Sequence, residues 1–338
     1  MTDPSTDKVS GHVQAGINTA RNAPDPGYSM RGAVNLPVSD TLAVRLSSFS
    51  RRDAGNIDNP VRDERGVNQT NASGGRFSAL WRPSESFSWK FGAMLQNSKS
   101  DGSPAVFLAP GFGDLEQNYL PGAGANETEA HILNSTIKAK LSSVDFISVT
   151  GYSFNRWIGT LDNTSLASIT QPIFGVDGLR FDERFNIYKF SQEVRLSGAI
   201  NERIDWLLGG FYTQEKTTLF DDLPAIDSQS GTIPGSWGTL GAGSIYKEYA
   251  AFAALTYKFT DRFDVQVGGR QSRLIAQYKG MTVTGGFAST FFGSDPYSEP
   301  SQPENSESTF TYLLTPRFKI SPDMIYMEIG RASCRERV

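Results

Sequence analysis

Residues 28–47 read YSMRGAVNLPVSDTLAVRLS, and the pattern of this stretch decides the fold. Tyr28, Met30 and Val34 fall on one face of an extended chain, while Ser29 and Arg31 fall on the other. A turn at 39–41 follows, and the same alternation then resumes. A period of two indicates β-strands, and a turn this short joins antiparallel neighbours. The stretch therefore predicts a β-hairpin.

The same hairpin rhythm continues along most of the chain. Further short turns fall at 82–86, 142–143, 198–203, 261–262 and 321–323, and long polar loops fall between them at 52–73, 100–129, 159–185, 217–243 and 279–307. Short turns at one end of the strands and long loops at the other are typical of outer-membrane proteins. We therefore predict an all-β fold: an antiparallel transmembrane β-barrel with short periplasmic turns and long extracellular loops. Its place would be the bacterial outer membrane, in contact with lipid.

Composition fits this prediction. Mean hydropathy is −0.35 and the longest apolar run, residues 250–255, is far too short for a membrane helix. In a barrel strand only every second residue faces lipid, so a low mean hydropathy is expected. The net charge of −4 does not favour a nucleic-acid partner.

A soluble β-sandwich would also alternate, so two further features are needed to separate the two folds. The predicted strands run to about ten residues or more, which is the length that crosses a bilayer at a tilt. Aromatic residues also gather beside the short turns, as an interfacial girdle requires. They are Trp81, Phe87, Trp89, Trp206, Tyr257, Phe259, Phe263 and Phe318.

Charged residues within the predicted strands are assigned to the inner face of the barrel. A Lys or Arg on the lipid face costs about 2–4 kcal/mol at the bilayer midplane. The lumen-facing candidates are Arg31, Arg45, Lys90, Glu193, Arg195, Arg270, Arg317 and Lys319. Two roles are open for them: they line the path of a ligand or contact a plug, or they satisfy one another and water.

Several segments resemble TonB-dependent outer-membrane receptors of the siderophore type found in sphingomonads and related proteobacteria. They lie at residues 3–8, 28–41, 51–59, 190–196, 206–212 and 268–270, in the order and spacing of the family. The resemblance implies a barrel of 22 strands, a plug, and a TonB box ahead of the plug. It also implies uptake energised through TonB of a scarce nutrient such as a ferric siderophore. A passive, porin-like barrel is the alternative function.

The resemblance covers only part of such a receptor. About 13 strands can be counted, with no plug, TonB box or signal peptide, so we expect residues 1–327 to be a partial barrel domain. Residues 328–338 break the strand pattern and resemble a translated sequencing adapter. We expect an open sheet with free edges near 11–19 and 310–320. We also expect the chain after Met327 to gain no strand partner of its own.

No enzyme, cofactor or metal site is predicted. Only His12 and His131 are present, and the single cysteine, Cys334, lies in the tail. No second His or Cys completes a ligand set around Glu127 and Glu129, which precede His131. A surface enzyme embedded in the barrel is disfavoured because no nucleophile and base form a recognisable motif. Ligand-binding residues are expected in the long loops, where apolar contact is offered by Tyr119, Phe174, Phe220 and Trp237.

Overall fold

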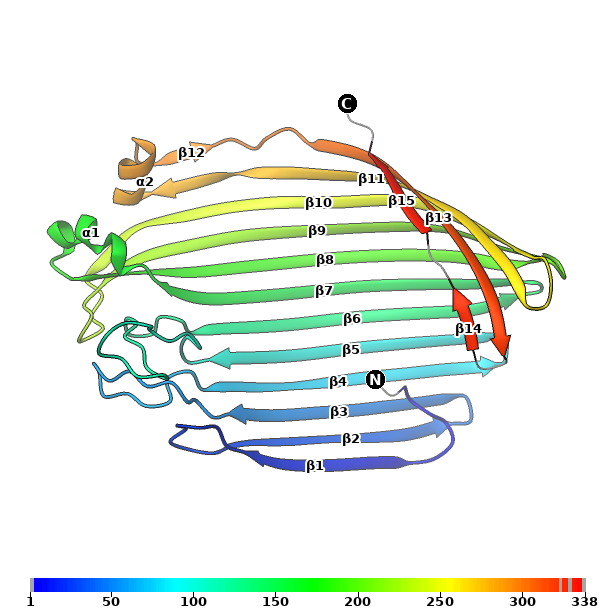
Figure 1. Ribbon diagram of the computed structural model, residues 1–338, viewed down its shortest axis with the longest axis horizontal. Helices are drawn as coiled ribbons and strands as arrows, with labels where there is room; N and C mark the ends of the chain where they lie inside the picture. Colours follow the sequence, from blue (N-terminus) through cyan, green and yellow to red (C-terminus); the bar gives the residue numbers. More distant parts are fainter. Residues whose placement is uncertain (1–2, 322–323, 328–329, 336–338) are drawn as a thin grey trace.

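Long antiparallel strands run side by side across the molecule and form one strongly curved sheet (Figure 1). The computed structural model describes residues 3–321, 324–327 and 330–335. The strands are β1 (Ser10–Asn18), β2 (Gly27–Ser39), β3 (Leu42–Asp53), β4 (Thr70–Ser84), β5 (Phe87–Ser100), β6 (Asn126–Leu141), β7 (Val144–Asp162), β8 (Gly178–Asn201), β9 (Ile204–Ile226), β10 (Gly235–Lys258), β11 (Phe263–Thr284), β12 (Tyr297–Glu299), β13 (Asn305–Ser321), β14 (Met324–Met327) and β15 (Gly330–Arg335). The helices are η1 (Thr164–Leu166), α1 (Ala167–Phe174) and α2 (Gly285–Phe292).

Strand order follows the chain. The main path runs from β1 to β11 and on through β13 to β14, while β12 pairs with β11 and β15 with β13. Within the described residues β1 pairs only with β2, so the sheet does not close. The expected open antiparallel sheet of about 13 strands is confirmed. As expected, β1 is a free edge and β13 lies beside the other edge.

The two rims of the sheet differ as predicted. The tight turns, such as those of β2–β3, β6–β7 and β8–β9, lie on one rim, and the long connections with α1 and α2 lie on the other (Figure 1). In the β2–β3 turn, the Ser39 hydroxyl accepts hydrogen bonds from the backbone N–H groups of Thr41 (3.2 Å) and Leu42 (3.1 Å). The turn predicted at 321–323 falls partly outside the described residues.

The strands are longer than the sequence pattern predicted. Most of the loop expected at 217–243 is strand, since β9 continues to Ile226 and β10 begins at Gly235. The other long connections also shrink, to 54–69, 101–125, 163–177 and 285–304. Beyond a membrane both faces of a sheet can meet water, so the alternation fades while backbone pairing continues.

The expectation that the chain after Met327 gains no strand partner is wrong. Residues 330–335 form β15, which pairs with β13 between Leu314 and Thr309. An open strand edge offers unpaired N–H and C=O groups to any extended segment nearby, and β13 has such an edge. Residues 328–329 and 336–338 lie outside the described residues, and the adapter origin of the tail stays a prediction.

Register divides the side chains between the convex and the concave face of the curved sheet. Leu255 stands opposite Val267, which stands opposite Leu314, and all three are about half exposed. The remaining large exposed apolar residues of this convex face include Met30, Leu46, Leu95, Leu133 and Leu208. In β7, Tyr152 pairs with Leu133 on the convex face, and Ile147 and Val149 lie on the other face. A continuous band of exposed apolar side chains marks this face for contact with lipid.

A second aromatic belt lies on the convex face, farther from the short turns than the first. Tyr212 lies 4.9 Å from Tyr249 and 6.2 Å from Phe190, and Phe154 lies 4.9 Å from Tyr188, ring centre to ring centre. Aromatic girdles flank the apolar band of outer-membrane barrels at both interfaces. The parts of β8, β9 and β10 beyond this belt therefore lie outside the membrane-spanning band.

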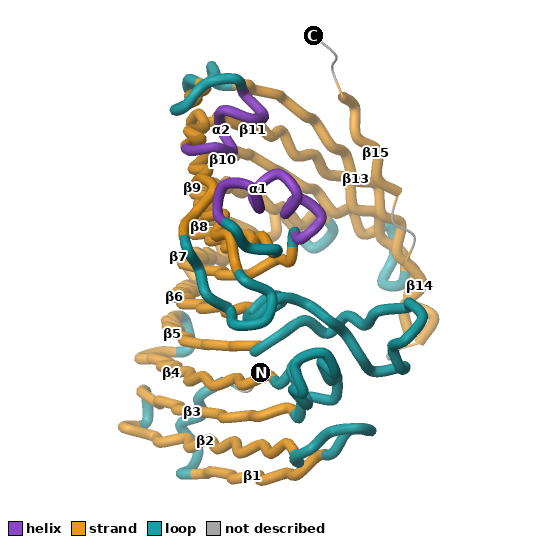
Figure 2. The backbone as a smooth tube through the Cα atoms, turned by 90° about the vertical axis from the view of Figure 1, so that its left-hand side faces the viewer, coloured by secondary structure: helices purple, strands orange, loops and turns teal. Residues whose placement is uncertain are grey.

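The fully buried core sits at the long-loop rim. Leu179, Leu223 and Trp237 pack together there, and Phe174 of α1 and Phe287 of α2 pack against them. Figure 2 shows both helices at this end of the sheet. None of the described helices is long and apolar enough to cross a membrane. The sheet itself has no second layer, so the loop end is where the molecule buries its apolar residues most completely.

Candidate functional site: the inner wall of the curved sheet

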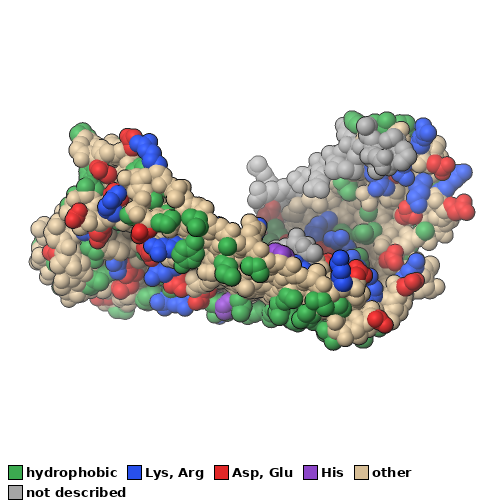
Figure 3. Space-filling view, turned by 90° about the horizontal axis from the view of Figure 1, so that it is seen from below, with side chains coloured by type: hydrophobic (Ala, Val, Ile, Leu, Met, Phe, Trp, Pro, Cys, Tyr) green, Lys and Arg blue, Asp and Glu red, His purple; other side chains and the backbone are tan. Residues whose placement is uncertain are grey.

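The concave face of the sheet carries the charged residues that the alternation assigned to it. Figure 3 shows basic and acidic side chains within the hollow of the curve. By register, all eight candidates share this face, namely Arg31, Arg45, Lys90, Glu193, Arg195, Arg270, Arg317 and Lys319. What separates them is whether a partner of opposite charge lies beside them, and in this respect the wall has two regions.

The first region, the paired cluster, lies on β8 to β11 and is built around Arg270. Its guanidinium donates to Glu248 Oε1 at 2.6 Å, and the Ser272 hydroxyl donates to the same oxygen at 3.1 Å. The guanidinium carbon also lies 5.2 Å from the ring centre of Phe211 and 5.8 Å from that of Phe252. Arg270 thus has both a carboxylate and two aromatic faces as partners, and this arrangement fixes its position.

Arg195 joins the same cluster from β8. It pairs with Glu193, two residues away on the same face, and lies 5.9 Å from the ring centre of Phe252. The Phe252 ring can extend over β9 because the residue opposite it is Gly209. A Cβ at Gly209 would meet the ring at 2.2 Å.

Nearer the short turns, further cations on this side of the sheet are paired. Arg317 bonds Asp264 directly across the β11–β13 ladder, and Lys258 bonds Asp205 at 2.7 Å. Lys319 lies beside the turn and makes no side-chain ion pair within the described part of the chain.

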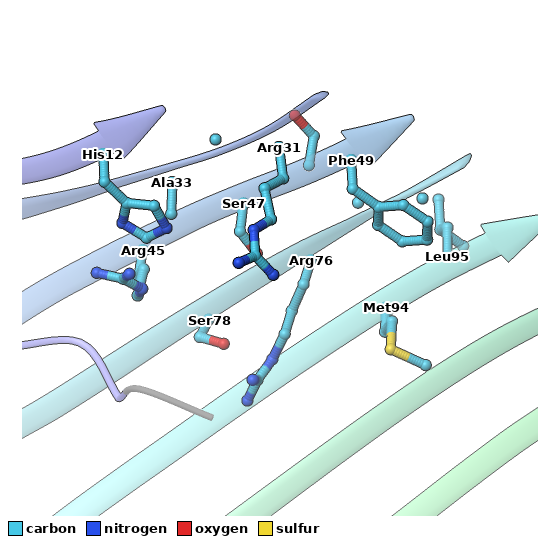
Figure 4. A pocket seen from close by; sticks show the side chains of 14 residues that line it. His12, Arg31, Ala33, Arg45, Ser47, Phe49, Arg76, Ser78, Met94 and Leu95 are labelled. Atoms are coloured by element: carbon cyan, nitrogen blue, oxygen red, sulfur yellow. The ribbon is translucent and has the colours of Figure 1, made fainter. Parts of the chain in front are cut away.

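The second region, the arginine cluster, lies on β2 to β4 and consists of Arg31, Arg45 and Arg76. Their side chains extend with that of His12 into a hollow of about 300 Å³ (Figure 4). Arg31 donates to Gln14 Oε1 at 2.8 Å, and no carboxylate in the described residues forms an ion pair with any of the three.

Arg76 is not among the residues that the sequence pattern singled out. The residues that precede it, 70–75, are small and polar, so the alternation there is too weak to assign a face. Register supplies the missing information. Arg76 stands opposite Ser47, which lies two residues from Arg45 along β3 and therefore on the same face. Lys90 lies farther along the same wall on β5, and it does have a partner, the Asp3 carboxylate at 2.8 Å.

An acidic pair lies on β8 and β9, closer to the long-loop rim of the concave face. Glu183 stands opposite Asp221, which is only 8% exposed and whose Oδ1 has no hydrogen-bond partner among the described residues. Burial, and then the neighbouring charge of Glu183, raise the pKa of Asp221 to about 6. Asp221 lies nine residues beyond Tyr212 along β9, or about 30 Å of strand, and so outside the membrane-spanning band.

The aromatic residues expected to contact a ligand from the loops are placed differently. Phe220 is on β9 and Trp237 on β10, so neither is a loop residue, and Trp237 is 1% exposed in the core. Phe174 packs on that core, and Tyr119 packs against Phe107, with ring centres 4.8 Å apart. The sequence could not distinguish an aromatic residue that covers a ligand from one that anchors a loop.

The two histidines face opposite sides of the sheet. His12 lies on the concave face beside the arginine cluster, whereas His131 lies on the convex face, with its ring centre 5.6 Å from that of Phe154. Among the described residues no three His, Cys, Asp or Glu side chains come together in a way that could hold a metal ion.

The sequence matches no protein-family model and no curated protein, but its fold matches solved structures. The ferric yersiniabactin uptake receptor FyuA from Yersinia pestis superposes with a TM-score of 0.73 at 15% identity, covering 96% of this chain and 46% of the receptor. The chain has the fold of part of a TonB-dependent receptor barrel.

Other receptors of this type match in the same way. The ferric-catecholate import receptor Fiu from E. coli K12 gives a TM-score of 0.67 at 12% identity, over 99% of this chain and 56% of Fiu. The ferric citrate transporter FecA gives 0.66 at 11% identity, over 95% of this chain and 43% of FecA. The chain spans about half the length of these proteins. Receptor barrels of this type reside in the bacterial outer membrane and transport ligands; they are not enzymes.

Proposed function

We propose that the chain is part of a TonB-energised receptor in the bacterial outer membrane, and that the receptor takes up a ferric siderophore. The observation that carries this proposal is the match of nearly the whole chain to a ferric-siderophore uptake receptor at a TM-score of 0.73. The convex band of exposed apolar residues, bounded by two aromatic belts, supports the membrane setting.

The partners follow from this proposal. The convex face contacts outer-membrane lipid, the concave face surrounds a plug and the path of the ligand, and TonB contacts the plug from the periplasm. Copper and citrate are named for two of the matching transporters, so the ligand class is the part of the proposal that most needs a direct test.

The test is an uptake experiment with the gene that encodes this chain, expressed in full in a host deprived of its own siderophore receptors. We expect radiolabelled iron to enter when it is supplied as a ferric siderophore, and entry to stop when TonB is deleted or the proton gradient is collapsed. A small sugar of similar mass serves as the leakage control.

Uptake that persists without TonB, together with free entry of the sugar, would identify a passive porin-like barrel and overturn the proposal. Entry of copper or citrate in place of the iron complex would keep the energised receptor and reject the siderophore.

A further inference from the structure

The arginine cluster is the least balanced charge arrangement on the inner wall. Arg31, Arg45 and Arg76 come from three neighbouring strands and open on one hollow of about 300 Å³ (Figure 4). Elsewhere on the wall, cations such as Arg270 and Arg317 have carboxylate partners. The side chains of Arg45 and Arg76 have no hydrogen-bond or ion-pair partner in the described part of the chain.

Gathering like charges in this way has a cost. Arg45 stands directly opposite Ser78, so Arg76 is its diagonal neighbour across the β3–β4 ladder. Side chains as long as Arg reach each other from diagonal positions, and like charges so placed destabilise a sheet. An anion bound in the hollow would offset this repulsion and would satisfy guanidinium donors that are otherwise left to water.

The geometry favours an anion with more than one charged group. Neighbouring strands lie about 4.8 Å apart, so side chains from β2, β3 and β4 start roughly 10 Å apart across the cluster. That spacing suits two or three carboxylates carried on one small molecule, each paired with a planar guanidinium fork. Phe49 and Met94 also line the hollow and offer apolar contact to the carbon skeleton of such a molecule.

We propose that this hollow is a binding site for a small polycarboxylate anion, held by Arg31, Arg45 and Arg76. This inference rests on the proposed function, because a ligand would reach the concave face while passing through the receptor. It adds to that function the position of a binding site on the barrel wall and the negative charge of the molecule bound there. Acidic side chains of a polypeptide packed inside the barrel would supply the same carboxylate chemistry, and the experiment separates the two sources.

The experiment measures binding of citrate to the intact protein, purified in detergent, by isothermal titration calorimetry. Loss of one charge-assisted hydrogen-bonding partner should weaken binding roughly 10- to 100-fold in Arg45→Gln and in Arg76→Gln. Arg317→Gln is the matched control, since Arg317 lies on the same wall but already has a carboxylate partner. The affinity of Arg317→Gln for citrate should stay within about twofold of that of the unaltered protein. Added salt should weaken citrate binding by the control variant and by the unaltered protein alike.

Two results would overturn the inference. In the first, citrate does not bind the unaltered protein, and Arg45→Gln and Arg76→Gln each lower the free energy of unfolding. This result would mean that the protein's own acidic side chains occupy the hollow. The other is that the control variant loses as much affinity as the cluster variants. Binding is measured without TonB or transport, so failed uptake with intact citrate binding would reject the proposed function alone.

Discussion

The paired cluster on β8 to β11 and the arginine cluster on β2 to β4 lie on the same wall of the same sheet, yet they satisfy their charges in opposite ways. Arg270 has a carboxylate at 2.6 Å and two aromatic rings beneath it, whereas Arg76 has no carboxylate partner among the described residues. A charge with fixed partners helps to hold the wall together. A charge without them is available to something that is not part of the wall.

The largest expected effect on stability is in the paired cluster. Glu248→Ala should lower the free energy of unfolding by about 2–3 kcal/mol, because the half-buried Arg270 guanidinium loses its acceptor. Denaturant unfolding of the intact protein in detergent or lipid measures this. Glu215→Ala is the matched control, since its pair with Lys189 is more exposed, and it should cost at most about 1 kcal/mol. Equal losses in both variants would contradict the special position of Arg270.

A somewhat smaller loss is expected where the aromatic partner rests on the sheet. Gly209→Val should destabilise the protein by about 1–2 kcal/mol, because its side chain would displace the Phe252 ring that lies under Arg195 and Arg270. The adjacent Gly210 faces the convex side, where an added Cβ would meet nothing closer than 3.9 Å, so Gly210→Val should have little effect. Similar stabilities for the two variants would show that the ring position does not matter.

The acidic pair gives a pH-dependent test. In the folded protein the pKa of Asp221 is about 6, above its ordinary value of 3.8, so between these values the folded state holds more proton than the unfolded state. The contribution of Asp221 is therefore fully present below about pH 4 and is lost as the pH rises through about 6.

Asp221→Asn should remove that slope and, at pH 8, raise the free energy of unfolding by about 1 kcal/mol. Glu183→Gln removes the neighbouring negative charge and should reduce the slope without abolishing it. Unfolding curves recorded from pH 4 to pH 8 measure both variants. A slope unchanged in Asp221→Asn would assign the pH dependence to other groups.

The smallest effect is expected in the arginine cluster. Arg76→Gln should change the free energy of unfolding by no more than about 0.5 kcal/mol, because it removes a like-charge neighbour and breaks no ion pair in the described residues. The same unfolding measurement applies. A loss as large as that of Glu248→Ala would show that Arg76 has a partner and would erase the difference between the two regions.

The sequence predicted the faces of the sheet well where apolar residues alternate cleanly. Arg31 and Arg45 lie between such residues, and their side of the sheet could be assigned from neighbours alone. Arg76 could not be assigned, because residues 70–75, which precede it, carry small and polar side chains on both faces. The sequence pattern places Trp237 in a loop because Gly and Ser surround it, although backbone pairing makes it part of β10.

The sequence by itself determined the strand period, the order of short turns and long loops, and the separation of apolar from charged faces. These are local properties, since side chains alternate along any extended chain. Only the tertiary structure decided that Glu248 meets Arg270, that Glu183 meets Asp221, and that β15 covers β13. Those contacts depend on the register between strands and on the curvature of the sheet, which no single strand contains.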